Sequence, residues 1–412
     1  MGTTTSEISQ ELWSIDEPCY IFHQNLLIEN IDLMREAFTK YYGNFQIAYS
    51  FKTNYLKRII ETVRNKNCLA EVVSPEERMY AEYCGYEGRD IVYNGVITDA
   101  RGKLLIMFCG GMVNVDNLNE LNHIVEVVER VKPVKPYGIG IRVNFSIGNG
   151  FVSRFGISID GDDFRKAIET ISKCKYLYLR GFHCHIGSSR PPEYWVKKIE
   201  TMIALAKNAD NEIEYIDIGG GFYGRMPFEL MEQFSGHSGD DIFSVYGDII
   251  GRTMKEAFPK EDVKLIVEPG TALVGNTMDV LANVTDIKEV EGSCYITTDT
   301  NSNSLGVICD IKNIPVEVIR RGSGDGAYIT DATIAGDTCL EFDYLKKGFN
   351  GRIDVGDKLL FKNVGAYSIS SSRQFITPRM AVVDADTMEV LREREGIDDM
   401  FRKYVSYSES DA

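Results

Sequence analysis

The most restrictive feature of this chain is an alternation of short apolar runs with segments of helical periodicity. Eight runs of strand length occupy residues 45–51, 69–74, 91–95, 112–116, 138–145, 179–186, 213–218 and 263–268. The segments around them carry apolar residues three and four positions apart, at 56–66, 75–85, 99–109, 118–131, 162–174, 194–209 and 245–258. Eight strands alternating with helices over roughly 230 residues predict a (β/α)8 barrel of the TIM type.

The rest of the chain predicts a second, all-β domain. After Thr271 the runs become shorter, at 278–284, 293–298, 316–320, 358–361 and 380–384, with turn signals at 322–326 and at Asn350-Gly351. A strand at 18–22 is expected to join this domain, and a helix at 26–41 to lead into the barrel. We therefore expect a barrel over 24–275, a β domain from 1–23 and 276–405, and a disordered tail over 406–412.

Composition excludes several classes of protein. A net charge of −16 argues against nucleic acid or an anionic membrane as a partner. The sequence contains no apolar run long enough for a membrane span and no signal-peptide pattern at its start. Nine scattered cysteines without a Cys-x-x-Cys pair indicate free thiols in a cytoplasmic protein.

Polar residues at the ends of the predicted barrel strands are the candidates for chemistry, because such barrels work at the C-terminal ends of their strands. These ends carry Lys52, Glu71, Ser74, Arg142, His183-Cys184-His185, Asp217 to Gly221 and Glu268-Pro269-Gly270. Each feature alone has an ordinary explanation: a solvated lysine, half of a metal site for His-x-His, or tight turns for the glycine motifs. Because all of them fall on one face of one barrel, a shared site is favoured.

Together these residues match the needs of pyridoxal 5′-phosphate. Its aldehyde requires a partly desolvated lysine amine to form a Schiff base, and Lys52 supplies one. Its ring nitrogen requires a carboxylate, for which Glu268 is the candidate, and its ring accepts a flat side chain such as His185. Its phosphate requires backbone N–H donors, which 219–221 offer, with the Ser188 hydroxyl as a further donor. This interpretation needs no metal ion.

Six motifs resemble the fold-type III pyridoxal phosphate-dependent decarboxylases, the group of diaminopimelate, ornithine and carboxynorspermidine decarboxylases, with alanine racemase a more distant relative. They occur in the family's order and cover about residues 18 to 376. They are Ser50-Phe51-Lys52-Thr53-Asn54, His183-Cys184-His185-Ile186-Gly187-Ser188, Asp217-Ile218-Gly219-Gly220-Gly221-Phe222, Glu268-Pro269-Gly270, Gly336-Asp337-Thr338-Cys339 and Gly365-Ala366-Tyr367.

The resemblance implies a role for each residue and an assembly. Lys52 would carry the cofactor, His185 would stack on its ring, and Glu268 would pair with the ring nitrogen. Cys339 would donate a proton after carbon dioxide leaves, from a loop that reaches the partner subunit's site, so the implied unit is a homodimer with shared sites. The remaining cofactor contacts implied are the phosphate ligands Ser188, Gly220, Gly221, Gly270 and Tyr367, and the orienting residues Glu71 and Arg142.

Two departures bear on the substrate. Thr271 stands where the family usually has an arginine, which would have to be replaced by another cation, with Arg225, Arg154 and Arg373 as candidates. Leu340 stands where diaminopimelate and ornithine decarboxylases have an acidic residue for the distal amino group, while Glu341 and Asp343 follow in the same loop.

We therefore expect a divergent branch of the family, one that decarboxylates an α-amino acid or an amino-acid-bearing biosynthetic intermediate other than diaminopimelate or ornithine. The first alternative is the diaminopimelate decarboxylase of lysine biosynthesis. An amino-acid racemase would need a second base opposite Lys52, usually a tyrosine, where this chain offers Cys339. A non-catalytic relative would be expected to lose the cofactor contacts, and these are retained.

Overall fold

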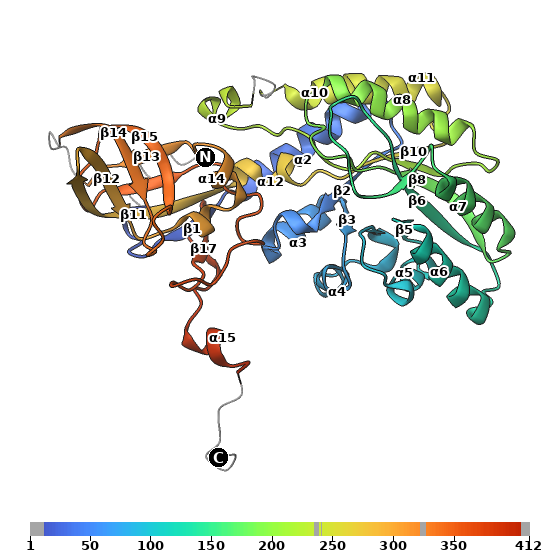
Figure 1. Cartoon of the computed structure of the whole chain (residues 1–412), viewed down its shortest axis with the longest axis horizontal. Coiled ribbons are helices and arrows are strands. Elements are labelled where there is room, and N and C mark those ends of the chain that lie inside the picture. Colours follow the sequence, from blue (N-terminus) through green and yellow to red (C-terminus); the bar gives the residue numbers. More distant parts are fainter. Residues whose placement is uncertain (1–11, 235–238, 240, 322–326, 405–412) are drawn as a thin grey trace, which may run out of the picture. The chain divides into compact units, whose positions relative to one another are not determined.

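The computed structural model describes residues 12–234, 239, 241–321 and 327–404. The chain divides into two compact units, drawn in Figure 1. The barrel unit comprises Asn25–Met226 and Phe234–Gly275, and the sheet unit comprises Met1–Gln24, Pro227–Gln233 and Asn276–Ala412. The short segment Pro227–Gln233 thus belongs to the sheet unit, although it lies inside the stretch expected to form the barrel. Within the described residues, no helix is long and apolar enough to cross a membrane.

The barrel unit confirms the predicted (β/α)8 architecture. Its parallel strands follow the order β5-β4-β3-β2-β10-β9-β8-β6, and pairing of β5 with β6 closes the ring. All eight expected runs form strands, namely β2 (Phe45–Ser50), β3 (Leu69–Val72), β4 (Ile91–Tyr93), β5 (Met112–Val115), β6 (Tyr137–Asn144), β8 (Leu177–His183), β9 (Tyr215–Asp217) and β10 (Lys264–Val267). A two-residue strand, β7 (Ile157–Ser158), pairs with the end of β6.

Helices cover the outside of the ring, and several begin with a side-chain cap. Ser74, Asp99 and Asn117 accept hydrogen bonds from backbone N–H groups at the starts of their helices. The helical elements of this unit are α2 (Gln24–Thr39), η1 (Phe51–Thr53), α3 (Lys57–Asn65), α4 (Pro75–Tyr83), η2 (Gly88–Asp90), α5 (Ala100–Phe108), α6 (Leu118–Val131), α7 (Asp162–Lys173), α8 (Glu193–Lys207), α10 (Ile242–Tyr246), η3 (Gly247–Gly251), α11 (Arg252–Ala257) and α12 (Thr271–Val274). The helix expected at 245–258 is α10 and α11 joined by the π-helical turn η3.

Four residues that pair in a row across neighbouring barrel strands include two glycines. Asn114 on β5 pairs with Gly140 on β6, Gly140 with Gly181 on β8, and Gly181 with Tyr215 on β9. The two middle positions have no side chain, and a Cβ on Gly140 would lie 2.1 Å from both Asn114 Oδ1 and Tyr215 Oη. The phenol of Tyr215 therefore reaches over the two glycines and donates to Asn114 Oδ1 at 2.7 Å.

The sheet unit has the order β15-β14-β12-β11-β1-β17-β18, with β16 joining β11 to β13. Near the N-terminus, β1 lies where a strand was expected, and it pairs with β11 and β17. The strands are β1 (Cys19–Phe22), β11 (Met278–Val290), β12 (Ser293–Thr298), β13 (Val316–Ile319), β14 (Tyr328–Ala335), β15 (Tyr344–Arg352), β16 (Lys358–Phe361), β17 (Ala381–Asp384) and β18 (Val390–Arg392). Its helices are α9 (Phe228–Glu232), α13 (Ser302–Leu305), α14 (Val307–Ile311) and α15 (Ile397–Phe401), and η4 (Gly275–Thr277) lies at the junction of the units.

One turn prediction in this unit was wrong. Asn350-Gly351 lies inside β15, where Gly351 pairs with Ile329 of β14, because pairing of these two long strands outweighs the local turn preference. The strands β14, β15 and β18 were not expected from the sequence. The turn signal at 322–326 and the tail at 406–412 lie outside the described residues.

Candidate active site

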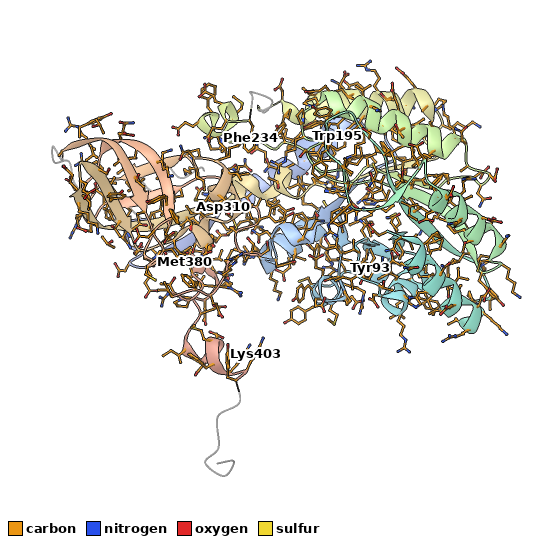
Figure 2. All side chains as sticks on the ribbon, viewed as in Figure 1. Tyr93, Trp195, Phe234, Asp310, Met380 and Lys403 are labelled. Carbon is orange, nitrogen blue, oxygen red and sulfur yellow. The ribbon has the colours of Figure 1, made fainter. Side chains whose placement is uncertain are left out.

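A cavity of about 320 Å³ lies in the barrel unit, at the ends of its strands. Lys52, Arg142 and His185 line it together with two buried carboxylates, Glu71 and Glu268. Most of the charged residues that the sequence placed at the strand ends therefore share one cavity. Figure 2 shows all side chains, with Tyr93 on β4 and Trp195 on α8 labelled for orientation.

Lys52 lies in the single turn η1, directly after β2. Its Nζ donates to Glu71 Oε2 at 2.7 Å and to Ser50 Oγ at 2.6 Å, and Ser50 Oγ in turn donates to Glu71 Oε2 at 2.5 Å. The Lys52 side chain is 33% exposed and the Glu71 side chain 2%, so a buried carboxylate holds an amine that remains reachable from the cavity. This is the arrangement that covalent chemistry at an amine requires.

Glu268 follows β10 and receives a donor at each of its oxygens. Asn94 Nδ2 lies 2.6 Å from Oε1, and His183 Nε2 lies 3.1 Å from Oε2. Burial alone would raise the pKa of Glu268, but His183, with a further contribution from Lys52, holds that pKa below its usual range. The pKa of the neighbouring Asp217 is raised well above its usual range by burial and by the Glu268 charge. Glu268 is therefore the anion of the pair, and Asp217 carries the proton.

The two histidines of the His-x-His motif bind different partners. His183 contacts Glu268, whereas His185 Nδ1 accepts a hydrogen bond from the backbone N–H of Gly220 at 3.1 Å. Desolvation and then the Lys52 charge lower the pKa of His185 well below its usual value, so its ring is neutral. A neutral, flat ring held by one nitrogen suits stacking better than shared metal ligation.

The glycine loop after β9 has fewer free donors than the sequence indicated. Gly219 donates its N–H to Asp217 Oδ1 at 2.8 Å, and Gly220 donates to His185. The N–H of Gly221, at a φ of +99°, has no partner within the described residues. Ser189 Oγ lies 2.7 Å from where a Gly221 Cβ would stand, and it is buried without a partner in the described part of the chain. A free N–H beside a buried, unpartnered hydroxyl can donate hydrogen bonds to an anionic oxygen.

Ser188, which the sequence analysis expected to be a phosphate donor, is not buried beside the glycine loop. Ser188 is exposed and adopts a left-handed φ of +55°, and its carbonyl accepts a hydrogen bond from Asn149. Of the two adjacent serines, Ser189 is therefore the one whose hydroxyl adjoins the glycine loop. The sequence did not distinguish them, because a single change of backbone direction exchanges which of two neighbouring side chains is buried.

Arg142 is 6% exposed and pairs with Asp116 at 3.2 Å. Its guanidinium lies over the Phe155 ring at 4.7 Å, and the guanidinium of Arg154 lies over the same ring at 4.0 Å. Arg154 lines the cavity and has no ion-pair partner among the described residues, whereas Arg225 pairs with Glu29 at 2.9 Å. Of the two replacement cations considered on the barrel, Arg154 is the one that lines the cavity.

Three buried polar residues near this cavity were missed by the sequence analysis. Asn94 Nδ2 donates to Glu268 and lies 3.3 Å from Glu71 Oε1, and Asn94 Oδ1 accepts from Asn114 Nδ2 at 2.8 Å. Asn114 in turn accepts from Tyr215. Polar residues inside strands of otherwise apolar runs were the available signal, because a buried amide requires partners.

The sheet unit carries the remaining candidates on two segments. Cys339 is exposed in the loop between β14 and β15, with Leu340 50% exposed and Glu341 also exposed. Asp343 is buried, and its carboxylate accepts from Ser302 N, Thr338 N and Thr338 Oγ1 at 2.8, 3.1 and 2.6 Å. Asp343 therefore shapes the loop and has little capacity left to bind a substrate.

Tyr367 is half-buried with a φ of +56°, and Gly306 packs against its carbonyl so closely that a Cβ there would lie 2.5 Å away. The arrangement leaves room only for a residue without a side chain at position 306. Arg373, the third replacement cation considered, is exposed in this unit.

These features fit pyridoxal phosphate. The barrel cavity offers a reachable amine, an anionic carboxylate and a neutral imidazole. The glycine loop, which is hydrogen-bonded to His185, adds a free backbone N–H beside a buried hydroxyl that no described residue satisfies. Together they meet the separate needs of an aldehyde, a protonated ring nitrogen, a ring face and a phosphate.

Comparisons with known proteins agree with this fit. The sequence model of a family described as "Pyridoxal-dependent decarboxylase, pyridoxal binding domain" matches residues 27–275. The diaminopimelate decarboxylase of Aquifex aeolicus is 27% identical over 96% of this chain and 93% of its own, and that of Methanocaldococcus jannaschii is 25% identical over 98% and 97%. A crystal structure of diaminopimelate decarboxylase from M. jannaschii superposes with a TM-score of 0.85 at 22% identity, covering 97% of this chain and 94% of its own, which shows a shared fold.

Proposed function

Since this chain belongs to the family of pyridoxal-dependent decarboxylases, we propose that it removes the α-carboxylate of an amino acid whose distal end is not a lone ammonium group, using Lys52 as the residue that binds the cofactor covalently. Dependence on pyridoxal phosphate and decarboxylation of an amino acid follow from the family. The residue roles and the choice of substrate are the proposal.

The observation that carries the assignment of Lys52 is its contact with Glu71 inside the cavity. The Glu71 carboxylate and the Ser50 hydroxyl accept hydrogen bonds from the amine and so fix its direction. Attack on an aldehyde requires the amine without its extra proton, and Glu71 is the group within hydrogen-bond reach that can hold this proton.

Glu268 would hold the proton of the cofactor's ring nitrogen, because an anionic carboxylate in a site with little water stabilises a neighbouring cation strongly. When bound, the cofactor supplies an electron sink for the pair of electrons left as carbon dioxide departs. His185 would lie against the ring. Gly220, Gly221, Gly270 and Tyr367 would contact the phosphate, with Ser188 or, by its burial beside Gly221, Ser189 as the hydroxyl donor.

Cys339 would return a proton to the α-carbon, and its exposure on a loop suits a group that must reach a site elsewhere. By resemblance to the family, that site would be the one on a partner subunit, so we propose a homodimer with shared active sites. Asp343 would keep the loop in shape, as its three hydrogen bonds support.

The proposed substrate follows from the cavity lining and from Leu340. Both carboxylates that line the barrel cavity, Glu71 and Glu268, already have donors. A distal ammonium placed against Leu340 would lose its hydration without gaining a partner, which costs several kcal/mol. Arg154, in contrast, lines the cavity without an ion-pair partner among the described residues, so its charge can serve a neutral or anionic group. We therefore expect substrates with a neutral, acidic or substituted distal end.

Diaminopimelate is the second candidate substrate, and a specific observation favours it. Three relatives that match over nearly their whole length, from A. aeolicus, M. jannaschii and Methanothermobacter thermautotrophicus, are named diaminopimelate decarboxylase. Diaminopimelate carries a carboxylate beside its distal ammonium, so Arg154 offers it one partner where lysine and ornithine would find none.

A panel of amino acids assayed for carbon dioxide release tests the proposal directly. The panel contains meso-diaminopimelate, lysine, ornithine and amino acids with neutral or acidic distal groups. Release from the last set with little from the diamino acids supports the first substrate class, and efficient turnover of meso-diaminopimelate replaces it with the second.

Borohydride reduction followed by peptide mapping tests the lysine separately. Lys52→Ala should abolish the covalent trapping of pyridoxal phosphate. Lys57→Ala is the matched control, because Lys57 is 60% exposed on α3 and pairs with Glu61. Trapping at another lysine in Lys52→Ala would show that the assignment is wrong.

A further inference from the structure

The side chain of Asn94 contacts both carboxylates of the cavity, Glu71 and Glu268. It is 2% exposed, directly after β4. Its Nδ2 lies 2.6 Å from Glu268 Oε1 and 3.3 Å from Glu71 Oε1. A primary amide has two N–H donors, so it can satisfy one oxygen of each carboxylate at the same time.

The direction of the Asn94 amide is imposed from the other side of the barrel. Burial raises the pKa of the Tyr215 phenol, which therefore keeps its proton and donates a hydrogen bond to Asn114 Oδ1. Asn114 must then present its N–H group to Asn94 Oδ1. With its oxygen occupied in this way, Asn94 turns its N–H group toward Glu71 and Glu268. The hydrogen-bond network thus settles an orientation that an isolated amide would leave open.

The barrel makes room for this relay by omitting side chains. Gly140 and Gly181 lie between Asn114 and Tyr215 in one row of strand pairs, and a Cβ on Gly181 would lie 2.6 Å from the Tyr215 ring. Two adjacent strands thus leave space above the glycines, and the phenol and the amide fill it. A polar network in a barrel interior is stable when each member has its partner, and each of these contacts has one.

We propose that Asn94 is a positioning residue, oriented by Tyr215 through Asn114, whose amide holds the carboxylates of Glu71 and Glu268 in fixed positions beside the bound cofactor. The proposal rests on the proposed roles of Lys52 and Glu268. It adds that Glu71, beside the Lys52 amine, and Glu268, expected at the ring nitrogen, share one hydrogen-bond donor, the Asn94 amide. Losing that donor should change the protonation of the cofactor at both ends, not only the stability of the barrel.

The test uses the cofactor-loaded protein and its absorbance spectrum, recorded without substrate from about pH 6 to pH 10. Asn94→Leu removes both donors at similar volume, and Tyr215→Phe removes only the hydroxyl that orients the relay. Carboxylates with fewer donors are more basic and stabilise a neighbouring cation more, so the protonated form of the bound cofactor should persist to higher pH, by about one pH unit for Asn94→Leu and less for Tyr215→Phe. Asn94→Asp should change the spectrum in the same direction, because it adds a negative charge.

The double variant separates a relay from two independent effects. If Tyr215 acts through Asn94, Tyr215→Phe should change the spectrum of the unsubstituted protein but add nothing in the Asn94→Leu background. Additive changes would show that the phenol acts by another route and would overturn the relay.

Two matched controls lie elsewhere in the barrel unit. Asn30 is buried on α2 and donates to the Leu273 carbonyl, and Tyr42 is buried and donates to the Val263 carbonyl. Asn30→Leu and Tyr42→Phe should lower the melting temperature while leaving the spectrum unchanged. Spectra of Asn94→Leu and Tyr215→Phe that superpose on that of the unsubstituted protein at every pH would overturn the proposal. If Asn94→Leu fails to fold, Tyr215→Phe alone decides.

Peptide mapping after borohydride reduction is applied to every variant. Trapping at Lys52 with unchanged spectra would refute the role of Asn94 and leave the proposed function standing. Trapping elsewhere would refute the proposed function itself.

Discussion

Glu268 in the barrel unit is 3% exposed and receives hydrogen bonds from two other buried side chains, whereas Cys339 in the sheet unit is exposed and has no hydrogen-bond partner for its thiol among the described residues. The barrel fixes its functional groups through a network in which each member orients the next. The sheet unit fixes a loop through one carboxylate, Asp343, and leaves the side chains at the tip of the loop free. A change in the barrel should therefore affect the chemistry, and a change in the loop should affect which substrate is accepted.

The largest effect should come from Glu268→Gln. Glutamine retains the shape and one acceptor but loses the negative charge, so it stabilises a protonated ring nitrogen poorly. Turnover should fall by roughly two orders of magnitude or more, the scale of one lost electrostatic contact, while affinity for the cofactor falls much less. Carbon dioxide release and cofactor titration measure the two quantities.

The control for this variant is Glu120→Gln, which removes a buried charge paired with Lys103 outside the cavity. It should destabilise the protein with little change in the turnover of the folded fraction. Near-normal turnover in Glu268→Gln would show that Glu268 does not have its proposed role. It would also contradict the expectation that changes in the barrel affect the chemistry.

The next effect tests how the loop is held. Asp343→Ala deprives two backbone N–H groups and one hydroxyl of their acceptor, which should lower the free energy of unfolding by about 1–3 kcal/mol. Glu341→Ala, two residues away and exposed, should change it very little. Chemical denaturation of both variants provides the comparison, and equal stabilities would show that Asp343 does not hold the loop.

A smaller effect should appear in the pH dependence of barrel stability. The raised pKa of Asp217 means that the folded protein keeps a proton that the unfolded chain releases above about pH 4. Stability is then lost as pH rises from that value toward the pKa of the folded state. Asp217→Asn keeps an acceptor for Gly219 and a donor for Glu268 without titrating. The melting temperature of this variant, relative to the parent, should therefore increase from pH 5 to pH 8.

Glu268 contributes with the opposite sign. Its lowered pKa adds stability that is present at neutral pH and is lost only as the pH falls through the pKa of the folded state. A difference in melting temperature between Asp217→Asn and the parent that does not vary with pH would contradict the assignment of the proton to Asp217.

The smallest effect should be a change of preference at the loop. Leu340→Glu supplies an anion for a distal ammonium, so the ratio of lysine or ornithine turnover to that of neutral amino acids should rise a few-fold, with little change in cofactor binding. Leu340→Gln is the matched control, since it adds polarity without charge. An equal rise in both variants would show that the charge is not the cause.

The sequence predicted the barrel well because its strands are nearly continuous apolar runs between amphipathic helices, a pattern that burial on both faces imposes. It predicted β14 and β15 poorly. Asp331 in β14 has a left-handed φ of +54°, and β15 contains Asn350-Gly351, so both strands carry residues typical of turns. Their pairing with each other depends on distant parts of the chain, and local preference cannot indicate that.

The candidate site shows the same difference between residues that local sequence indicates and residues that only distant contacts place. Lys52 and Glu268 stand in short motifs with recognisable chemistry, and both line the cavity. Asn94 precedes Gly95, and an Asn-Gly pair at the end of a strand ordinarily indicates a turn. Its contacts come from β3, β5 and the end of β10, so its environment depended on closure of the barrel. The choice between Ser188 and Ser189 likewise depended on one backbone torsion.

The row formed by Asn114, Gly140, Gly181 and Tyr215 has a consequence for the evolution of this protein. An alanine at position 140 would collide with both the amide and the phenol, so it becomes acceptable only when smaller residues replace both of them. None of these positions can change independently. A lineage that loses Tyr215 can acquire a side chain at position 181, which would then hinder the return of the tyrosine. In a library built to alter this enzyme, positions 114, 140, 181 and 215 should therefore be randomised together.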